Sequence, residues 1–266
     1  MYLWSEDTAS RGPEEIASCL LYHLEKLPPT VTEIVLYSDS CSGQNRNITV
    51  SLMLKHFLSR SQNVQKITQK FLVTGHSYNS CNRNFGLIEK DSRKHKIIAT
   101  LDEWASIIEK SKRSLPHLKV TQMKTTDFLS FTELEGMICN WKEDVGKNKA
   151  GKTADDFMNH NPSLLYPNGR EISEAKKKDL MDLMPLVTEE MLVSVTSKFG
   201  NVLTSGPYRT YWVHCSLSNE STNSRLVTSK RRNHAIDGLL DSPANAAADI
   251  RVRADGSVLE DMHGGG

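Results

Sequence analysis

Hydrophobic and polar positions follow two patterns along the first 125 residues. In residues 10–29, apolar side chains recur every three or four positions and Pro28 and Pro29 end the pattern, which predicts a helix. Residues 32–38 form a short run of β-branched and aromatic side chains, which is typical of a strand. The same patterns predict helices at 47–61, 79–94 and 100–111 and strands at 65–75 and 117–123, after a strand end at 1–4.

This alternation of strands and helices favours an α/β domain with parallel strand pairs. After residue 140 the pattern loosens, and two short helices are predicted there, at 173–185 and 188–199. Beyond about residue 218 large apolar residues are few, so little burial can offset the entropy of ordering. We therefore predict an α/β domain at 1–125, a helical extension at 126–200 and a mostly disordered tail at 201–266.

Charge and composition narrow the class of protein. The 266-residue chain has a formal net charge of +1, so any contact with nucleic acid must come from local basic patches. No stretch is apolar for long enough to span a membrane, and no signal peptide is visible. The five cysteines are odd in number and lack paired spacing, which favours free thiols in a reducing compartment. We expect an intracellular protein, nuclear or cytoplasmic, without membrane association.

Polar residues gather where the predicted strand 32–38 ends. Ser38 and Asp39 close its apolar run, and Gln44 and Asn45 lie in the loop that follows. In open α/β sheets the functional crevice lies beyond the carboxyl ends of the strands, which makes Asp39 a candidate site residue. An aspartate in such a loop can equally cap the next helix or form an Asx turn.

The strand 65–75 is predicted to deliver a second polar group to the same edge. His76 follows it directly, and Asn82 and Glu89 lie two helical turns apart, on one face of the next helix. Asp39 and Glu89 could then converge on one cation with His76 nearby, and carboxylates with open positions suit Mg²⁺ or Mn²⁺. The structural alternatives are a turn at His76 and an exposed ion pair at Glu89.

Residues 146–153, GKNKAGKT, match the letters of a phosphate-binding P-loop. A working P-loop needs a buried strand before it and a helix after it. The preceding residues 134–145 have a helical period instead, and the following residues 154–162 are short and acidic. The context therefore favours a solvated loop, with nucleotide binding as an alternative.

Four stretches resemble successive motifs of a large uncharacterised family of transposon-derived animal proteins, abundant in insects, that carry a domain of unknown function. They are MYLWSEDTASRGPEEIASCLLYHL (1–24), LYSDSCSGQNRN (36–47), VTGHSYNSCNRNFGLIEK (73–90) and KKKDLMDLMPLV (176–187). The resemblance runs from residue 1 to about residue 200. The family's domain resembles a ribonuclease H-like fold, which many transposases and integrases share. That resemblance implies a mixed sheet flanked by helices.

In that fold three strands precede the first helix, and the catalytic acids lie on the first strand, at the end of the fourth strand and on a late helix. The resemblance makes 1–4 the third strand and Asp39 the second metal-binding acid, with Gln44 and Asn45 as its polar surroundings. Glu89, or position 82, would lie on the helix after the fifth strand. The resemblance also implies that the first strand and its acid are absent from this chain.

Two residues depart from the family pattern. Asn82 stands where the family usually has an aspartate, and Ser5 where an aspartate follows the tryptophan. An amide offers Mg²⁺ only a neutral oxygen, so Mg²⁺ affinity is predicted to be weak or lost. We expect a catalytically inactive domain that retains binding of nucleic acid, most simply DNA, or of protein. The alternatives are an active Mg²⁺-dependent nuclease or strand-transfer enzyme and a P-loop nucleotide-binding protein.

Overall fold

The computed structural model describes residues 1–72, 80–96, 98, 100–138, 148–171, 173–175, 178, 210–219 and 246–254. Its main elements are β1 (Tyr2–Ser5), α1 (Pro13–Leu24), β2 (Val31–Ser38), α2 (Ile48–Arg60), β3 (Lys66–Phe71), α3 (Ser80–Ser92), α4 (Leu101–Ser111), β7 (Thr210–Asn219) and β8 (Ala246–Ala254). Shorter elements are β4 (Thr121–Gln122), a 3₁₀ turn (Thr125–Asp127), β5 (Leu129–Ser130), α5 (Thr132–Gly136), α6 (Ala154–Asn159) and β6 (Ser163–Leu164).

The predicted α/β class is confirmed, and the four helices and two strands predicted between residues 10 and 111 are all present. Their ends follow local chemistry. Pro13 begins α1, the Asn47 side chain accepts a hydrogen bond from the Val50 N–H at the start of α2, and Thr100 forms a capping box at the start of α4. The strand predicted at 117–123 is reduced to the two residues of β4.

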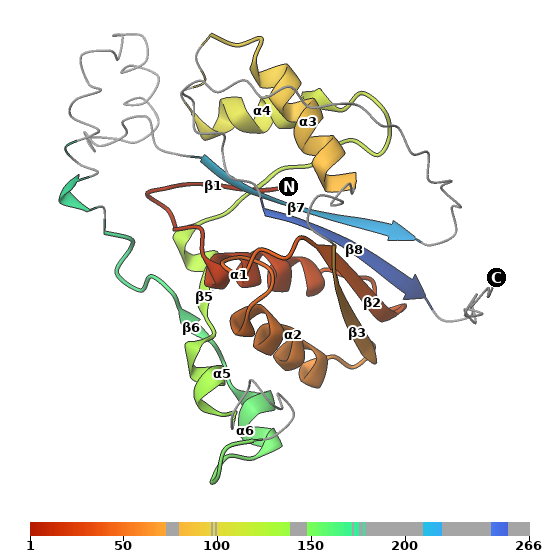
Figure 1. Cartoon of the computed structure of the whole chain (residues 1–266), viewed down its shortest axis with the longest axis vertical. Helices are drawn as coiled ribbons and strands as arrows, with labels where there is room; N and C mark the ends of the chain where they lie inside the picture. The colour runs from red at the N-terminus through yellow and green to blue at the C-terminus, as the bar shows by residue number, and fades with distance from the viewer. Residues whose placement is uncertain are drawn as a thin grey trace.

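A six-stranded mixed sheet has the order β3-β2-β8-β7-β1-β4. The pairs β2–β3 and β1–β4 are parallel, whereas β7 is antiparallel to β1 and β8 is antiparallel to β2. The central pair, β7 and β8, is parallel. Figure 1 shows α1 and α2 on one side of β7 and β8, and α3 and α4 on the other. The elements therefore form three layers, with helices on both faces of the sheet.

Residues 210–219 and 246–254 form the strands β7 and β8, whereas a mostly disordered tail was expected at 201–266. Both strands lie in the middle of the sheet, between β1 and β2. Composition averaged over the whole segment hid two short stretches that are richer in strand-forming residues, TYWVHC in β7 and IRV in β8. Residues 220–245 and 255–266, and nearly all of the two helices predicted at 173–199, lie outside the described residues.

A second, smaller sheet follows the main one along the chain. It consists of β5 and β6, which pair antiparallel through Leu129–Leu164 and Ser130–Ser163. The segment from β5 to β6 also carries α5 and α6, which pack against α2. Part of what was expected to be a separate helical extension therefore covers the α1–α2 layer.

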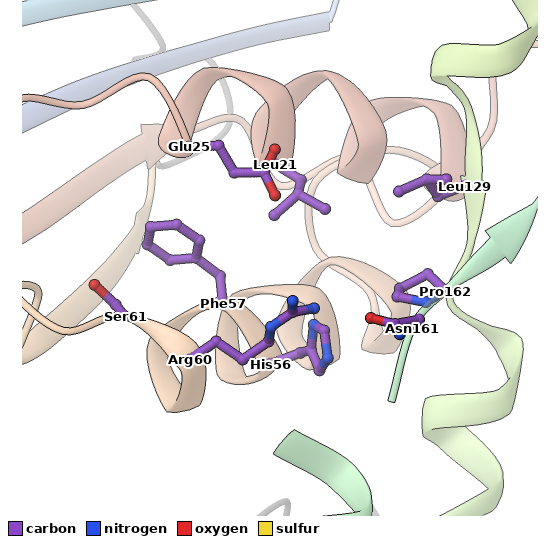
Figure 2. A pocket seen from close by; sticks show the side chains of 9 residues that line it. All are labelled: Leu21, Glu25, His56, Phe57, Arg60, Ser61, Leu129, Asn161 and Pro162. Carbon is purple, nitrogen blue, oxygen red and sulfur yellow. The ribbon is translucent and has the colours of Figure 1, made fainter. Parts of the chain in front are cut away.

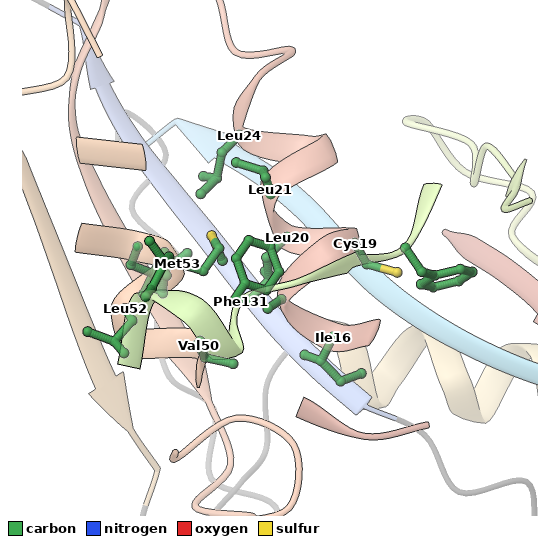
Figure 3. Packing of buried hydrophobic residues seen from close by; sticks show 14 of the residues in the cluster. Ile16, Cys19, Leu20, Leu21, Leu24, Val50, Leu52, Met53 and Phe131 are labelled. Carbon is green, nitrogen blue, oxygen red and sulfur yellow. The ribbon is translucent and has the colours of Figure 1, made fainter. Parts of the chain in front are cut away.

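Each face of the main sheet has its own apolar core. The larger core joins Tyr2 and Trp4 of β1 to buried residues of α1, α2 and the α5 region; Figure 3 shows part of it, including Ile16, Leu20, Leu24, Met53 and Phe131. The smaller core joins Leu3 of β1 to Cys81, Phe85 and Ile88 of α3 and Ile108 of α4. Because successive residues of a strand point to opposite faces, β1 contributes to both cores.

His23, at the end of α1, makes folding stability depend on pH. Its Nδ1 lies 3.0 Å from the Tyr2 hydroxyl oxygen. Burial, followed by the positive charges of the N-terminal amine and Lys26, lowers the pKa of His23 to about 4. The unfolded chain therefore takes up a proton below about pH 6.5 that the folded chain does not bind until about pH 4. The stability that depends on a neutral His23 is fully present above pH 6.5 and is lost as the pH falls from 6.5 to 4.

We expect His23 to account for a loss of about 3 kcal/mol in the free energy of unfolding between pH 6.5 and pH 4. His23→Gln removes the titration and keeps a hydrogen-bonding partner for Tyr2. Urea unfolding at several pH values should show a shallower decline for this variant than for the wild type. Parallel pH profiles for the two proteins would contradict the assignment.

Candidate functional site

β2 and β3 bring their carboxyl ends side by side at the edge where Asp39 lies. Ile34, Leu36 and Ser38 are buried along β2, and Asp39 is the half-buried residue that follows. Beyond the parallel β2–β3 pairing, the Leu72 N–H donates to the Ser38 carbonyl at 2.8 Å, and the Ser40 hydroxyl donates to the Leu72 carbonyl at 3.1 Å. The exits of the two strands are therefore fixed to each other.

The loop after β2 folds back on Asp39. Oδ1 of Asp39 accepts hydrogen bonds from the Cys41 N–H at 3.2 Å and from Nδ2 of Asn45 at 2.7 Å. The Cys41 carbonyl accepts from the N–H groups of the residues at positions 44, 45 and 46, at 3.2, 2.8 and 3.0 Å. Asp39 thus forms an Asx turn, whereas the cap of α2 is Asn47.

Two further residues complete this loop, and sequence reasoning did not find them. Gln69 of β3 donates through Nε2 to the Asn45 carbonyl at 3.0 Å. With the Gln44 amide oxygen turned toward Arg11, it accepts from Nε and Nη2 of that side chain at 3.0 and 3.2 Å. Arg11 precedes α1 in a polar stretch, and Gln69 lies within a strand pattern, so neither carries a local signal. The loop is therefore held by the segment before α1 and by β3.

The loop commits one carboxylate oxygen of Asp39 and leaves the other open. Asn45 is 2% exposed and Gln44 is 7% exposed, so their amides serve the interior of the loop. Oδ2 of Asp39 makes no hydrogen bond to any residue that the structure describes. A single half-buried carboxylate oxygen can accept one donor or contribute one ligand to a cation.

The structure does not join Glu89 to Asp39. Glu89 of α3 pairs with Arg93 at 2.5 Å, with 58% of its side chain exposed. Asn82 is also exposed on α3, and no hydrogen bond or ion pair links Asp39 to Glu89. His76 lies outside the described residues. Convergence of Asp39, Glu89 and His76 on one cation remains a prediction.

Acids elsewhere at this edge have structural partners. Glu14 of α1 accepts from the Phe131 N–H at 2.8 Å, and its partial burial raises its pKa. Glu15 is 3% exposed and accepts from the Gly12 N–H at 2.8 Å. At the exit of β1, the Ser5 hydroxyl donates to Asp7. Among the described residues, no group of three or more His, Cys, Asp and Glu side chains is arranged to hold a metal ion.

Sheet topology also separates the exits of β1 and β2. Both strands run in the same direction, but β7 and β8 lie between them, and the pairing register sets Ser38 level with Cys215 of β7 and Ser5 level with Thr210. Three steps of about 4.8 Å place the two exits about 14 Å apart across the sheet. Carboxylates at the exits of β1 and β2 are therefore too distant to share one ion.

In the sequence that matches a P-loop, GKNKAGKT, the described residues 148–153 make contacts that a P-loop would not make. Thr153 caps α6: its hydroxyl accepts from the Asp156 N–H at 3.1 Å, and its own N–H donates to the Asp156 carboxylate at 2.7 Å. These contacts place a carboxylate where a P-loop would hold a phosphate. The Lys149 N–H donates to the Met137 carbonyl at 2.9 Å, and Lys152 is exposed. Positions 146 and 147 lie outside the described residues.

We therefore expect no saturable ATP binding, either by the wild type or by Lys152→Ala. Calorimetric titration with ATP and Mg²⁺ measures this directly. Saturable, Mg²⁺-dependent binding by the wild type that disappears in Lys152→Ala would show a working phosphate loop.

Charge is distributed unevenly between the helical layers. Residues 60–124, which include β3, α3 and α4, contain thirteen Lys and Arg against five Asp and Glu. The exposed cations around the ends of α3 and α4 are Lys90, Arg93, Lys94, Lys96, Lys110, Arg113 and Lys119. A hydrogen bond from Lys94, with the charges of Lys94, His95 and Arg113, lowers the pKa of Asp91, so Arg113, which follows α4, acts on the end of α3. We call these seven residues the basic α3–α4 surface.

No helix in the described part of the chain is both long and apolar enough to cross a membrane.

The mixed sheet with helices on both faces, and the polar loop at the exits of β2 and β3, define a mixed α/β domain. Residues 2–149 match a family described as a domain of unknown function, DUF7869, and the chain belongs to that family. Neither the curated proteins nor the solved structures contain a match to the chain.

Proposed function

We propose that this chain is a transposon-derived, ribonuclease H-like domain that binds nucleic acid through the basic α3–α4 surface and does not cleave it. Strand order supports the fold assignment. On the ribonuclease H-like plan β1 is the third strand and β2 the fourth, and two strands lie between them in the sheet. Two strands lie between β1 and β2 here as well, and β2 pairs in parallel with β3. β7 and β8 differ from the plan's first two strands in running parallel to each other.

The arrangement of carboxylates supports a domain without nuclease activity. Two-metal phosphoryl transfer needs several carboxylates to hold the ions and to clamp the attacking and leaving oxygens. Asp39 gives one oxygen to its own loop, and Glu89 is paired with Arg93. Asn82 and Ser5 offer no negative charge. Any Mg²⁺ bound at Asp39 would therefore be held weakly.

The basic α3–α4 surface carries the proposal of nucleic-acid binding. Exposed Lys and Arg side chains release counterions from phosphates when they bind, which gives affinity without sequence preference. The net charge of the whole chain is only +1, so this excess of cations is local and is balanced by acids elsewhere. A local excess of exposed Lys and Arg of this kind is the expected footprint of a phosphate-binding domain.

The binding test uses fluorescence anisotropy with labelled single-stranded and double-stranded DNA at several salt concentrations. The variant Lys90→Gln/Lys96→Gln/Lys119→Gln removes three exposed cations of the basic α3–α4 surface. A matched control, Lys26→Gln/Lys149→Gln/Lys152→Gln, removes three exposed cations elsewhere. We expect the first variant to bind more weakly, with the salt slope for double-stranded DNA reduced by about 2 to 3. Equal losses in the two variants, or no binding by the wild type, would refute the proposal.

A second candidate, an active Mg²⁺-dependent nuclease or strand-transfer enzyme, is favoured by the open Oδ2 of Asp39. Incubation of the purified chain with the same DNA in Mg²⁺ or Mn²⁺ separates the two functions. We expect no cleavage by the wild type or by Asp39→Asn. Cleavage that Asp39→Asn abolishes would establish the enzyme.

A further inference from the structure

A pair of adjoining cavities opens on the layer opposite the basic α3–α4 surface. One cavity, of about 370 Å³, lies between α1, α2 and the Asn161–Pro162 segment, and Figure 2 shows its lining residues. The second, of about 400 Å³, is lined by Met158 and Asn159 of the α6 region and by the end of α2. Arg60 and Asn161 line both cavities, so the two are parts of one groove. The first cavity has the volume typical of small-molecule sites.

Arg60 gives this groove its chemistry. Its side chain is exposed, reaches into the first cavity beside His56 in Figure 2, and makes no hydrogen bond or ion pair with the described residues. The Asn161 side chain is likewise without a hydrogen bond in the described part of the chain. A guanidinium with its donors open matches the planar oxygens of carboxylate and phosphate groups. Among the residues that line the first cavity, Arg60 carries the positive charge and Glu25 the negative charge.

The remaining lining is suited to an apolar body. His56 is 2% exposed, and because a carbonyl oxygen can only accept, its Nε2 donates to the His160 carbonyl at 2.9 Å. Burial, and more weakly the charges of Arg60 and His160, lowers the pKa of His56 and keeps its ring neutral. Leu21, Phe57 and Leu129 form an apolar wall. The groove therefore combines one cation with an apolar side.

We propose that this groove binds a small organic anion, with its phosphate or carboxylate group on Arg60 and Asn161 and its apolar body against Leu21, Phe57 and Leu129. Glu25, at the α1 side of the cavity, disfavours a second negative charge in the ligand. This site is separate from nucleic-acid binding at the basic α3–α4 surface.

The experiment titrates the full chain with phenyl phosphate, benzoate and phenol, followed by calorimetry and by amide chemical shifts. Phenyl phosphate and benzoate distinguish phosphate from carboxylate recognition, and phenol tests the need for a charge. We expect Arg60→Gln to weaken anion binding at least about tenfold. Glu25→Gln should tighten anion binding, because it removes the one negative charge among the described residues of the lining. Lys149→Gln, the matched loss of an exposed cation elsewhere, should have no effect.

Thermal melting of each variant checks that the fold is intact. The triple variant of the basic α3–α4 surface should bind phenyl phosphate as the wild type does, which keeps this test independent of the DNA test. Undiminished binding in Arg60→Gln, or no binding of either anion by the wild type, would overturn the proposal. Binding of phenol as tight as that of the anions, or anion binding lost in Glu25→Gln, would overturn it as well.

Discussion

A chain that ends at residue 204 is expected not to fold into the sheet described here. The truncation removes β7 and β8, which lie between β1 and β2 and are hydrogen-bonded to them. Without them β1 and β2 lose their partners on facing edges, and each unpaired buried backbone group costs about 1–3 kcal/mol. The summed cost of several such groups is comparable to the whole free energy of unfolding of a typical domain, which is about 5–15 kcal/mol. Exposed strand edges should also make the truncated chain aggregate.

The comparison requires three proteins: the full chain, the chain ending at 204 and a control chain ending at 255, which keeps both strands. We expect the control to melt cooperatively near the wild-type temperature and the shorter chain to be insoluble or to show no cooperative transition. Ile250→Pro tests β8 alone, because Ile250 pairs with Leu36 on one side and Leu217 on the other, and proline removes a backbone donor. A soluble 1–204 chain that melts within a few degrees of the full chain would mean that β7 and β8 are dispensable.

Trp4→Ala is expected to lower the free energy of unfolding by about 3–5 kcal/mol. Trp4 is 0% exposed, and its ring contacts Phe128 with centroids 5.4 Å apart. Its Nε1 also donates to the Ser10 carbonyl at 2.9 Å, a bond that alanine cannot make. The substitution therefore leaves a cavity in the larger core and detaches the stretch between β1 and α1.

Urea unfolding measures this loss, with Leu115→Ala as the control. Leu115 is 80% exposed, so truncation there should change stability by no more than about 0.5 kcal/mol. Trp4→Phe keeps most of the apolar volume but loses the hydrogen bond, and should fall between the two. Equal stability of Trp4→Ala and Leu115→Ala would show that β1 does not anchor the core.

Local sequence patterns were sufficient for the elements whose amphipathic period is long. The periodic residues of α1, such as Ile16, Leu20 and Leu24, are buried as the period predicted. The placement of Asp39 at the end of a buried strand was also predictable, because Ile34 and Leu36 define the strand and Asp39 ends its apolar run. The family match over residues 2–149 agrees with the resemblance to a domain of unknown function.

Contacts between distant segments were not predictable in this way. The partners of the Asp39 loop, Arg11 and Gln69, come from before α1 and from β3. The cavity at Arg60 requires Asn161, which lies about a hundred positions further along the chain. Each of these residues is a common polar type in an unremarkable local context, so only the folded chain identifies them.

The sequence by itself determined which segments are helices or strands in the first 111 residues, which of their faces are buried, and that Asp39 leaves the sheet at a carboxyl end. The tertiary structure decided that β1 and β2 are not neighbours, that strands from 210–254 fill the space between them, and that the exits of β1 and β2 are therefore far apart. Hydrophobic periodicity is a property of the side chains of one segment, and it indicates which face of that segment is buried. Strand pairing is made by backbone groups that are alike in almost every residue, so which strand lies beside which is decided only when the whole chain packs.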